Sequence, residues 1–184
     1  MSSVKASVVQ VDDRILVEAA QAGDADAFEM LVRRYYAPVY RIALRLLASS
    51  ADADDVTQDT FLRAWRSVSR FRGDSSFATW LYRIVTRRCF DLFAAHRPTV
   101  VLDEDHLGPS VDPSTTIEQR ERLHAITARI QALPPDQRAA LVLREFEGLS
   151  YAQVANVLET TVPAIKGRIH RARLTLLKET TAWR

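Results

Sequence analysis

Positively charged side chains dominate a short segment near the carboxyl end of the chain. Between Thr160 and Lys178 every charged residue is a Lys or an Arg, and the segment follows a polar turn at 159–161. Arg side chains bind guanine edges with two hydrogen bonds, and Lys side chains bind phosphate. We therefore expect a helix-turn-helix whose second helix enters a DNA major groove. A basic amphipathic helix could also bind a membrane or an acidic partner, but the turn and the helix before it favour DNA.

Local signals place both helices of this motif. Ser150 followed by Gln153 is a capping-box pattern, and Pro163 suits the first turn of the second helix. Ile165, Ile169, Ala172 and Leu176 recur at helical spacing and are expected to face inward. For His170 a plain surface position is an equal alternative to DNA contact. The candidate DNA-contacting residues are Lys166, Gly167, Arg168, His170, Arg171 and Arg173.

Negative charge gathers at the start of a predicted helix over 52–66. One side of this helix, at 100° per residue, carries Val56, Thr60, Phe61, Ala64 and Val68 and is expected to face the core. The acids suit the helix dipole, so a solvated charged face is one interpretation. The opposite side presents Asp55, Gln58, Asp59, Leu62 and Arg66, with Trp65 at its edge. Large apolar groups beside a polar strip often mark a protein-docking surface, and the pattern alone leaves both interpretations open.

Aromatic and basic residues alternate over 70–84, around a turn at 72–76. Such a surface suits single-stranded nucleic acid, because bases stack on the rings at roughly 1–3 kcal/mol each while cations neutralise phosphates. Phe71 and Trp80 could instead be core residues, and Ser75 or Ser76 is first of all a helix cap. The helix that follows carries three arginines that cannot all be buried and are expected on its exterior: Arg83, Arg87 and Arg88.

Length and composition limit the possible functions. The chain has 184 residues and a net charge of +2, which excludes a generally basic nucleic-acid coat. The single cysteine, Cys89, excludes an internal disulfide and a Cys-based zinc site, and the four His show no metal-ligand spacing. No apolar run approaches the roughly 20 residues needed to cross a bilayer, and no signal-peptide pattern is present. We expect a cytoplasmic protein with no metal, no cofactor and no direct membrane insertion.

Helical spacing of apolar residues extends over nearly the whole chain, which predicts an all-α protein. Pro38 is expected to kink or restart the second helix. The segment from His96 to Thr116 contains three prolines and an acidic cluster, as a flexible linker does. Helices are expected over 13–22, 77–95, 117–133 and 136–147, among others. The predicted organisation is a tail over 1–12, a helical domain over 13–96, a linker over 97–116 and a second helical domain over 117–180.

Three stretches, in this order, resemble a bacterial sigma factor of the extracytoplasmic-function group of the sigma-70 family. They are DDVTQDTFLRAW at 54–65, FRGDSSFATWLYRI at 71–84, and LPPDQR at 133–138 leading to GLSY at 148–151. The resemblance covers about 13–178. It implies a sigma-2-like domain before the linker and a sigma-4-like helix-turn-helix domain after it. Such a protein is a dissociable, non-catalytic subunit of RNA polymerase that recognises and helps to melt promoters, commonly of a stress- or signal-responsive regulon.

The resemblance also implies roles for particular residues. The acidic helix would dock on the coiled coil of the polymerase β′ subunit, through Asp55, Gln58, Asp59, Leu62 and Trp65. The last helix would bind the −35 element through the six residues named above. Further implied partners are the polymerase β subunit and an anti-sigma factor able to hold the chain at the membrane, with no small-molecule substrate. The unwound −10 element would be held by Phe71, Arg72, Gly73, Asp74, Ser75, Trp80, Arg83, Arg87 and Arg88.

Two positions depart from the family pattern. The recognition helix of the family often begins Gly-Thr-Val-Lys-Ser-Arg, whereas 163–168 is PAIKGR and lacks both hydroxyls. We therefore expect DNA binding to depend more on Lys166, Arg168 and Arg171. Arg87 stands where the family often has Asn, and a phosphate contact is expected there instead.

The residues alone leave two other classes of protein open. An ordinary helix-turn-helix regulator would bind duplex DNA without polymerase, and it needs neither the acidic helix nor the aromatic-basic segment. A metal-dependent hydrolase of nucleic acid would need a carboxylate cluster. Its only candidates are Asp52, Asp54, Asp55 and Asp59, and no basic or nucleophilic partner lies near them in sequence.

Overall fold

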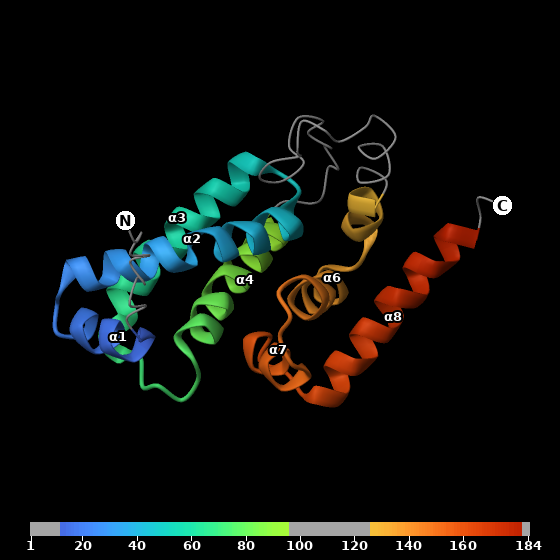
Figure 1. Ribbon diagram of the computed structural model, residues 1–184. Coiled ribbons are helices and arrows are strands. Elements are labelled where there is room, and N and C mark those ends of the chain that lie inside the picture. Colours follow the sequence, from blue (N-terminus) through green and yellow to red (C-terminus); the bar gives the residue numbers. More distant parts are fainter. Residues whose placement is uncertain (1–11, 96–125, 182–184) are drawn as a thin grey trace, which may run out of the picture.

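The computed structural model describes residues 12–95 and 126–181, with side chains described as far as Lys178. Within these ranges the regular elements are helices, in two groups (Figure 1). The predicted all-α, two-domain fold is thereby confirmed. The predicted tail over 1–11, the linker over 97–116 and the start of the predicted helix over 117–133 lie outside the described residues.

The first group comprises α1 (Asp13–Gln21), α2 (Ala25–Leu47), α3 (Ser50–Ser67), the 3-10 segment η1 (Val68–Arg70) and α4 (Phe77–Ala95). The second comprises a helical segment over 126–132, α6 (Pro135–Leu141), the π-helical segment η2 (Val142–Phe146), α7 (Tyr151–Val157) and α8 (Val162–Thr181).

Polar side chains cap the amino-terminal ends of these helices. Asp24 accepts hydrogen bonds from the backbone N–H groups of Asp26 and Ala27, at 2.9 and 3.1 Å. The Ser76 hydroxyl accepts one from the N–H of Thr79 at 3.1 Å, so Ser76 rather than Ser75 caps α4. These bonds satisfy N–H groups that have no partner within the helix. The predicted capping box of Ser150 and Gln153 is present in full at α7, and Asp12 and Ser49 cap α1 and α3.

Helix α2 continues through Pro38 and does not restart there. A proline inside a helix removes one backbone hydrogen bond and costs about 3 kcal/mol. Leu31 before it, and Val39 and Ile42 after it, are fully buried. The helix therefore places one continuous apolar face on the core, and burial of that face offsets the cost of the proline.

Buried apolar side chains from both groups of helices form one cluster. The predicted inward faces are confirmed for α3, where Val56, Phe61 and Ala64 are buried, and for α8, where Ile165 and Ile169 are buried. The predicted helix over 136–147 begins one residue earlier and changes to π-helical geometry at Val142, which sequence analysis did not predict. No helix of the described part of the chain is long and apolar enough to span a membrane.

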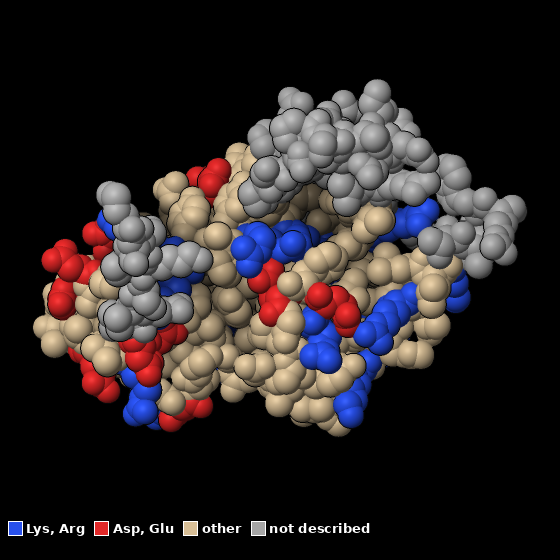
Figure 2. Space-filling model, viewed as in Figure 1, with Lys and Arg blue, Asp and Glu red and all other residues tan. Residues whose placement is uncertain are grey.

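The two groups of helices pack against each other. Helix α4 contacts α7, and α2 contacts both η2 and α6 (Figure 1). Basic and acidic side chains lie side by side in the middle of the face shown in Figure 2. Sequence analysis predicted two domains and made no prediction about how they contact each other.

The residue that ends α2 generates a test of the fold. Ala48 has φ 55°, in the left-handed region, and its N–H donates to the carbonyl of Leu44 at 2.8 Å. A residue with a Cβ pays roughly 1–2 kcal/mol for this conformation, more than the entropy that glycine loses. We expect Ala48→Gly to raise the free energy of unfolding by about 0.5–1 kcal/mol, measured by urea denaturation.

Ala22 provides the matched control, because it ends α1 with φ −78° and gains no relief of strain from glycine. Ala22→Gly should therefore lower the free energy of unfolding. Destabilisation by both substitutions would contradict the geometry at Ala48.

Candidate functional site

The exposed face of α3 has the composition of a docking surface. Asp55 and Gln58 are exposed, Leu62 is 55% exposed, and Trp65 is 38% exposed at the edge. The Trp65 ring packs against Phe28 of α2, with centroids 5.0 Å apart. These four side chains lie at the surface as expected, and the face combines exposed apolar and polar groups.

Asp59 forms ion pairs with two arginines and is therefore not a free carboxylate on this surface. It accepts a hydrogen bond from Arg63 Nε at 2.9 Å and another from Arg88 of α4. Burial alone would raise the pKa of the Asp59 carboxyl, but these hydrogen bonds and positive charges outweigh it and hold the pKa below its ordinary value. Asp59 therefore joins α3 to α4 and orients the docking surface.

A group of stacked rings extends the apolar surface from α3 to α2, and sequence analysis missed it. Tyr36 lies 6.3 Å from Phe61 and 6.4 Å from Tyr40, with nearly parallel rings in both pairs. Tyr36 is 41% exposed. The four-residue spacing of the two tyrosines would have indicated that they share one side of a helix.

The aromatic residues of the 70–84 segment form a cluster at the start of α4. Phe71 lies 5.1 Å from Trp80 and 6.1 Å from Phe77, which is buried. Phe71 and Trp80 pack against the core and are also partly exposed, so the core alternative is confirmed in part and base stacking stays a prediction. Gln21 of α1 donates to the carbonyl of Phe71 at 2.6 Å and positions the turn.

The turn presents polar groups beyond this cluster. Arg72, Gly73 and Asp74 are exposed, and Ser75 is partly buried. Gly73 has φ 74°, which glycine adopts without strain. Arg72 pairs with Asp74 at 2.9 Å, so the tip of the turn carries a cation and an anion together.

Only one of the three α4 arginines lies freely on the exterior as expected. Arg87 is exposed, whereas Arg83 and Arg88 are partly buried. Arg88 pairs with Asp59 and, at 2.8 Å, with Asp91. Arg83 donates to Asn156 Oδ1 of α7 at 2.6 Å. The expectation of three exterior arginines is wrong for Arg83 and Arg88, because carboxylates and an amide far away in sequence fold against them.

Helix α8 exposes fewer unpaired cations than its sequence suggests. Arg168 pairs with Asp136 at 3.1 Å and Arg173 with Glu145 at 2.6 Å, each across to another helix of the same domain. Lys166, His170 and Arg171 are exposed, and no carboxylate of the described residues pairs with them. Lys166 Nζ lies 5.7 Å from the centroid of the Tyr151 ring. These three side chains form the open basic face of α8.

Gly167 lies beside this face and is partly exposed. A Cβ added at Gly167 would lie 3.4 Å from Nη1 of Arg171, an ordinary van der Waals contact with the end of a flexible side chain. The structure therefore shows no steric need for glycine at this position.

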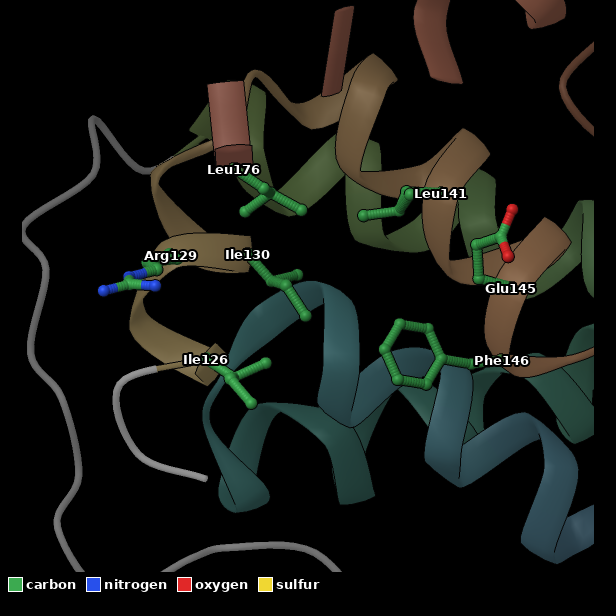
Figure 3. Close-up of a pocket in the computed structure, with 7 residues that line it drawn as sticks. All are labelled: Ile126, Arg129, Ile130, Leu141, Glu145, Phe146 and Leu176. Carbon is green, nitrogen blue, oxygen red and sulfur yellow. The ribbon is translucent and has the colours of Figure 1, made fainter. Parts of the chain in front are cut away.

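The second domain also has an apolar pocket that the sequence did not predict. Its volume is about 320 Å³, and it lies between the 126–132 segment, the α6–η2 helices and the carboxyl-terminal part of α8 (Figure 3). Figure 3 shows the Phe146 ring facing Ile130, whereas Arg129 points away from the cavity. The lining residues are Ile126, Arg129, Ile130, Leu141, Glu145, Phe146 and Leu176. An apolar side chain of a protein partner suits such a lining.

The structure offers no alternative chemistry at these surfaces. Over 12–95 and 126–178, no group of three or more His, Cys, Asp or Glu side chains could hold a metal ion. Cys89 is fully buried, and burial raises the pKa of its thiol to about 12, which makes it a poor nucleophile.

Family models match both domains of the chain. The family model of sigma-70 region 2 matches residues 31–99, and that of sigma-70 region 4 matches residues 123–176. The RNA polymerase sigma-H factor of Pseudomonas aeruginosa is 36% identical over 178 residues, covering 90% of this chain and 92% of that protein. The ECF RNA polymerase sigma-E factor of Escherichia coli K12 is 35% identical over 176 residues, covering 89% and 92%.

Solved structures show the same fold. CnrH, in complex with the cytosolic domain of CnrY, superposes with a TM-score of 0.73 at 31% identity, covering 92% of this chain and 97% of CnrH. The sigma factor RpoE of Bartonella quintana, in complex with the anti-sigma factor NepR, superposes with a TM-score of 0.67 at 23% identity, covering 85% and 98%. Two helical domains, one of them ending in a helix-turn-helix, thus define a protein of the sigma type. The chain belongs to the extracytoplasmic-function group of sigma-70 family RNA polymerase sigma factors.

Proposed function

We propose that the chain is a dissociable specificity subunit of RNA polymerase that recognises −35 and −10 promoter elements and helps to melt the DNA. The observation that carries this proposal is the presence, on one chain, of three exposed surfaces: an apolar and polar face on α3, an aromatic cluster with the exposed Arg87 on α4, and the open basic face of α8. The chain performs no chemistry of its own. It supplies binding energy that favours open over closed promoter DNA.

The α3 face docks on the coiled coil of the β′ subunit. Leu62 and Trp65 supply the apolar contact, Asp55 and Gln58 surround it with polar groups, and Asp59 orients the helix through Arg88. An apolar centre with a polar rim is the usual anatomy of such an interface. The pocket around Phe146 and Ile130 gives the second domain its own protein contact, which we assign to the β subunit.

The turn at 71–76 and the start of α4 hold the unwound strand of the −10 element. Bases stack on Phe71 and Trp80, which are packed from behind and therefore lose little freedom on binding. Arg72, Gly73, Asp74 and Ser75 contribute polar groups at the tip, and Arg87 binds phosphate. Capture of unstacked bases offsets an opening cost of about a few kcal/mol per disrupted step. Arg83 joins this surface when Asn156 and Glu159 release it, whereas Arg88 stays paired with Asp59 and Asp91 of its own domain.

The open basic face of α8 enters the major groove at the −35 element. The exposed side chains of Lys166, His170 and Arg171 contact the DNA, and Gly167 adds no side chain between them and the groove. Arg168 and Arg173 flank this face, and their ion pairs with Asp136 and Glu145 orient them. Cationic contacts of this kind supply most of the affinity for DNA and make it dependent on salt.

An anti-sigma factor is the expected negative regulator. CnrH, which shares the fold and 31% of its sequence with this chain, was solved with the cytosolic domain of CnrY. We extend that kind of partner to this chain and place its action in the cytoplasm, with retention at the membrane through the anti-sigma factor.

Loss of a cation from the open basic face should weaken −35 binding. We expect Lys166→Ala and Arg171→Ala each to lower the affinity for a −35 duplex by roughly 3–10-fold and the salt slope by about 1, with no change in affinity for core polymerase. Fluorescence anisotropy across a salt series measures both quantities. The control is Arg33→Ala, an exposed cation on α2. Wild-type promoter affinity for both α8 variants would remove the −35 assignment.

Loss of the apolar centre of the α3 face should weaken polymerase binding. We expect Leu62→Ala to lower the affinity for core polymerase about 10-fold, because a central apolar anchor carries much of an interface energy. Ile15→Ala removes an equally exposed side chain from α1 and should leave the affinity unchanged. Asp59→Arg should also weaken docking, although it disturbs the Arg88 pair as well. Equal affinity of Leu62→Ala and wild type in a titration with labelled chain would exclude docking through α3.

A further inference from the structure

Three cations of α8 contact neighbouring side chains, and Lys166 does so differently from the other two. Arg168 and Arg173 each pair with a carboxylate of the same domain, at 3.1 and 2.6 Å. A carboxylate cancels the charge of the cation that it binds, so DNA phosphate must compete with it. Lys166 instead lies over the ring of Tyr151, with Nζ 5.7 Å from the ring centroid. An aromatic ring attracts a cation within about 6 Å and has no net charge, so this contact restricts Lys166 without neutralising it.

The Tyr151 ring is itself held in place. Tyr151 is the first residue of α7, and the capping box of Ser150 and Gln153 fixes the backbone at this point. Its side chain is half-buried and packs against the cluster of buried apolar residues. Arg144 Cζ lies 4.7 Å from the centroid of the same ring, and Arg144 Nη1 donates to the carbonyl of Leu149 at 2.7 Å. The ring therefore offers a rigid surface to the lysine that packs on it.

Lys166 has a long, flexible side chain at an exposed position. Its four-carbon stem has a large rotamer entropy, which is lost when the ammonium group is fixed against DNA. His170 lies four residues further along α8, so the two side chains share one side of the helix. Lys166 is exposed on that side even though it contacts the ring. Part of the entropy that DNA binding would remove is thus already lost in the free chain, which favours binding.

We propose that Tyr151 is a positioning residue for the −35 contact of Lys166: its ring holds the ammonium group on the open basic face of α8 and leaves the charge available to DNA. This inference rests on the proposed function, because it explains how one residue of the same −35 surface is placed. Tyr151 acts through Lys166 and needs no DNA contact of its own. Arg144 packs on the same ring and connects it to η2, the segment before the helix-turn-helix.

Replacement of the ring tests this placement. The probe is a fluorescent duplex that carries the −35 sequence shared by the run-off start sites of the chain. Tyr151→Leu keeps an apolar side chain but removes the ring, and we expect it to lower the affinity for this duplex about 2–5-fold. Every cation of α8 remains, so the salt slope should equal that of wild type, whereas Lys166→Ala lowers it by about 1. Tyr151→Phe keeps the ring and should retain the affinity.

A double-mutant cycle shows whether Tyr151 acts through Lys166. In the Lys166→Ala background, Tyr151→Leu should cause no further loss of affinity, because the side chain that the ring positions is absent. Equal fold losses in both backgrounds would place the effect of Tyr151 elsewhere and overturn the proposal. A Tyr151→Phe variant as weak as Tyr151→Leu would also overturn it, because the effect would then belong to the hydroxyl group. Circular dichroism must show wild-type helix content, and Tyr151→Met replaces Tyr151→Leu if that variant does not fold.

Nuclear magnetic resonance of the free chain distinguishes failure of this proposal from failure of the proposed function. Lysine occurs only at positions 5, 166 and 178, so labelling of the lysine ε-carbon gives three signals, and Lys166→Ala identifies one of them. Protons over the face of a ring are shielded. The Lys166 signal should therefore lie upfield of the other two in wild type and Tyr151→Phe, and move downfield in Tyr151→Leu.

The two measurements fail in different ways. A Lys166 signal that is the same in wild type and Tyr151→Leu would overturn the proposal even in a chain that directs transcription. A shielded signal in a chain that binds no promoter duplex would confirm the ring contact and remove the −35 function that it serves.

Discussion

The apolar stripe along each helix decides which of its other residues can meet a partner. Burial of Val56, Phe61 and Ala64 turns Asp55, Gln58 and Leu62 outward on α3. Burial of Ile165 and Ile169 does the same for Lys166 and Arg171 on α8. Rotation of either helix about its axis would expose apolar surface at about 25 cal/mol per Å² and bury charge. The polymerase-docking and DNA-binding faces are therefore fixed by the cores behind them.

Ion pairs then determine which charged residues are available. Arg168 and Arg173 pair with carboxylates of their own domain, and Arg88 pairs with Asp59. These arginines therefore hold neighbouring helices together as well as adding positive charge to the surfaces. The exposed positions without an ion pair on α8 are those of Lys166, His170 and Arg171, among the described side chains. The pairs that cross between domains, at Glu147 and Arg83, hold the first group of helices against the second.

Sequence patterns predicted the features that depend on neighbours along the chain. The caps at Asp24, Ser76 and Ser150 and the inward faces of α3 and α8 follow from side chains within a few residues. The pairing of Asp59 with Arg88 and the contact of Arg83 with Asn156 join positions 29 and 73 residues apart, and charge patterning does not select such partners. The restart considered as one outcome at Pro38 does not occur, because burial of α2 against α3 and α4 outweighs the cost of a proline within the helix. That burial also depends on residues far away in sequence. The pocket beside Phe146 arises only where separate helices meet.

The central claim is that this chain directs RNA polymerase to promoters. Run-off transcription of genomic promoter fragments, with core polymerase alone and with the chain added, tests that claim most directly. A sigma factor with these surfaces produces discrete transcripts only when the chain is present, from start sites that share −35 and −10 sequences. Absence of discrete transcripts across the fragment library, from a chain that is folded and binds core polymerase, would contradict it.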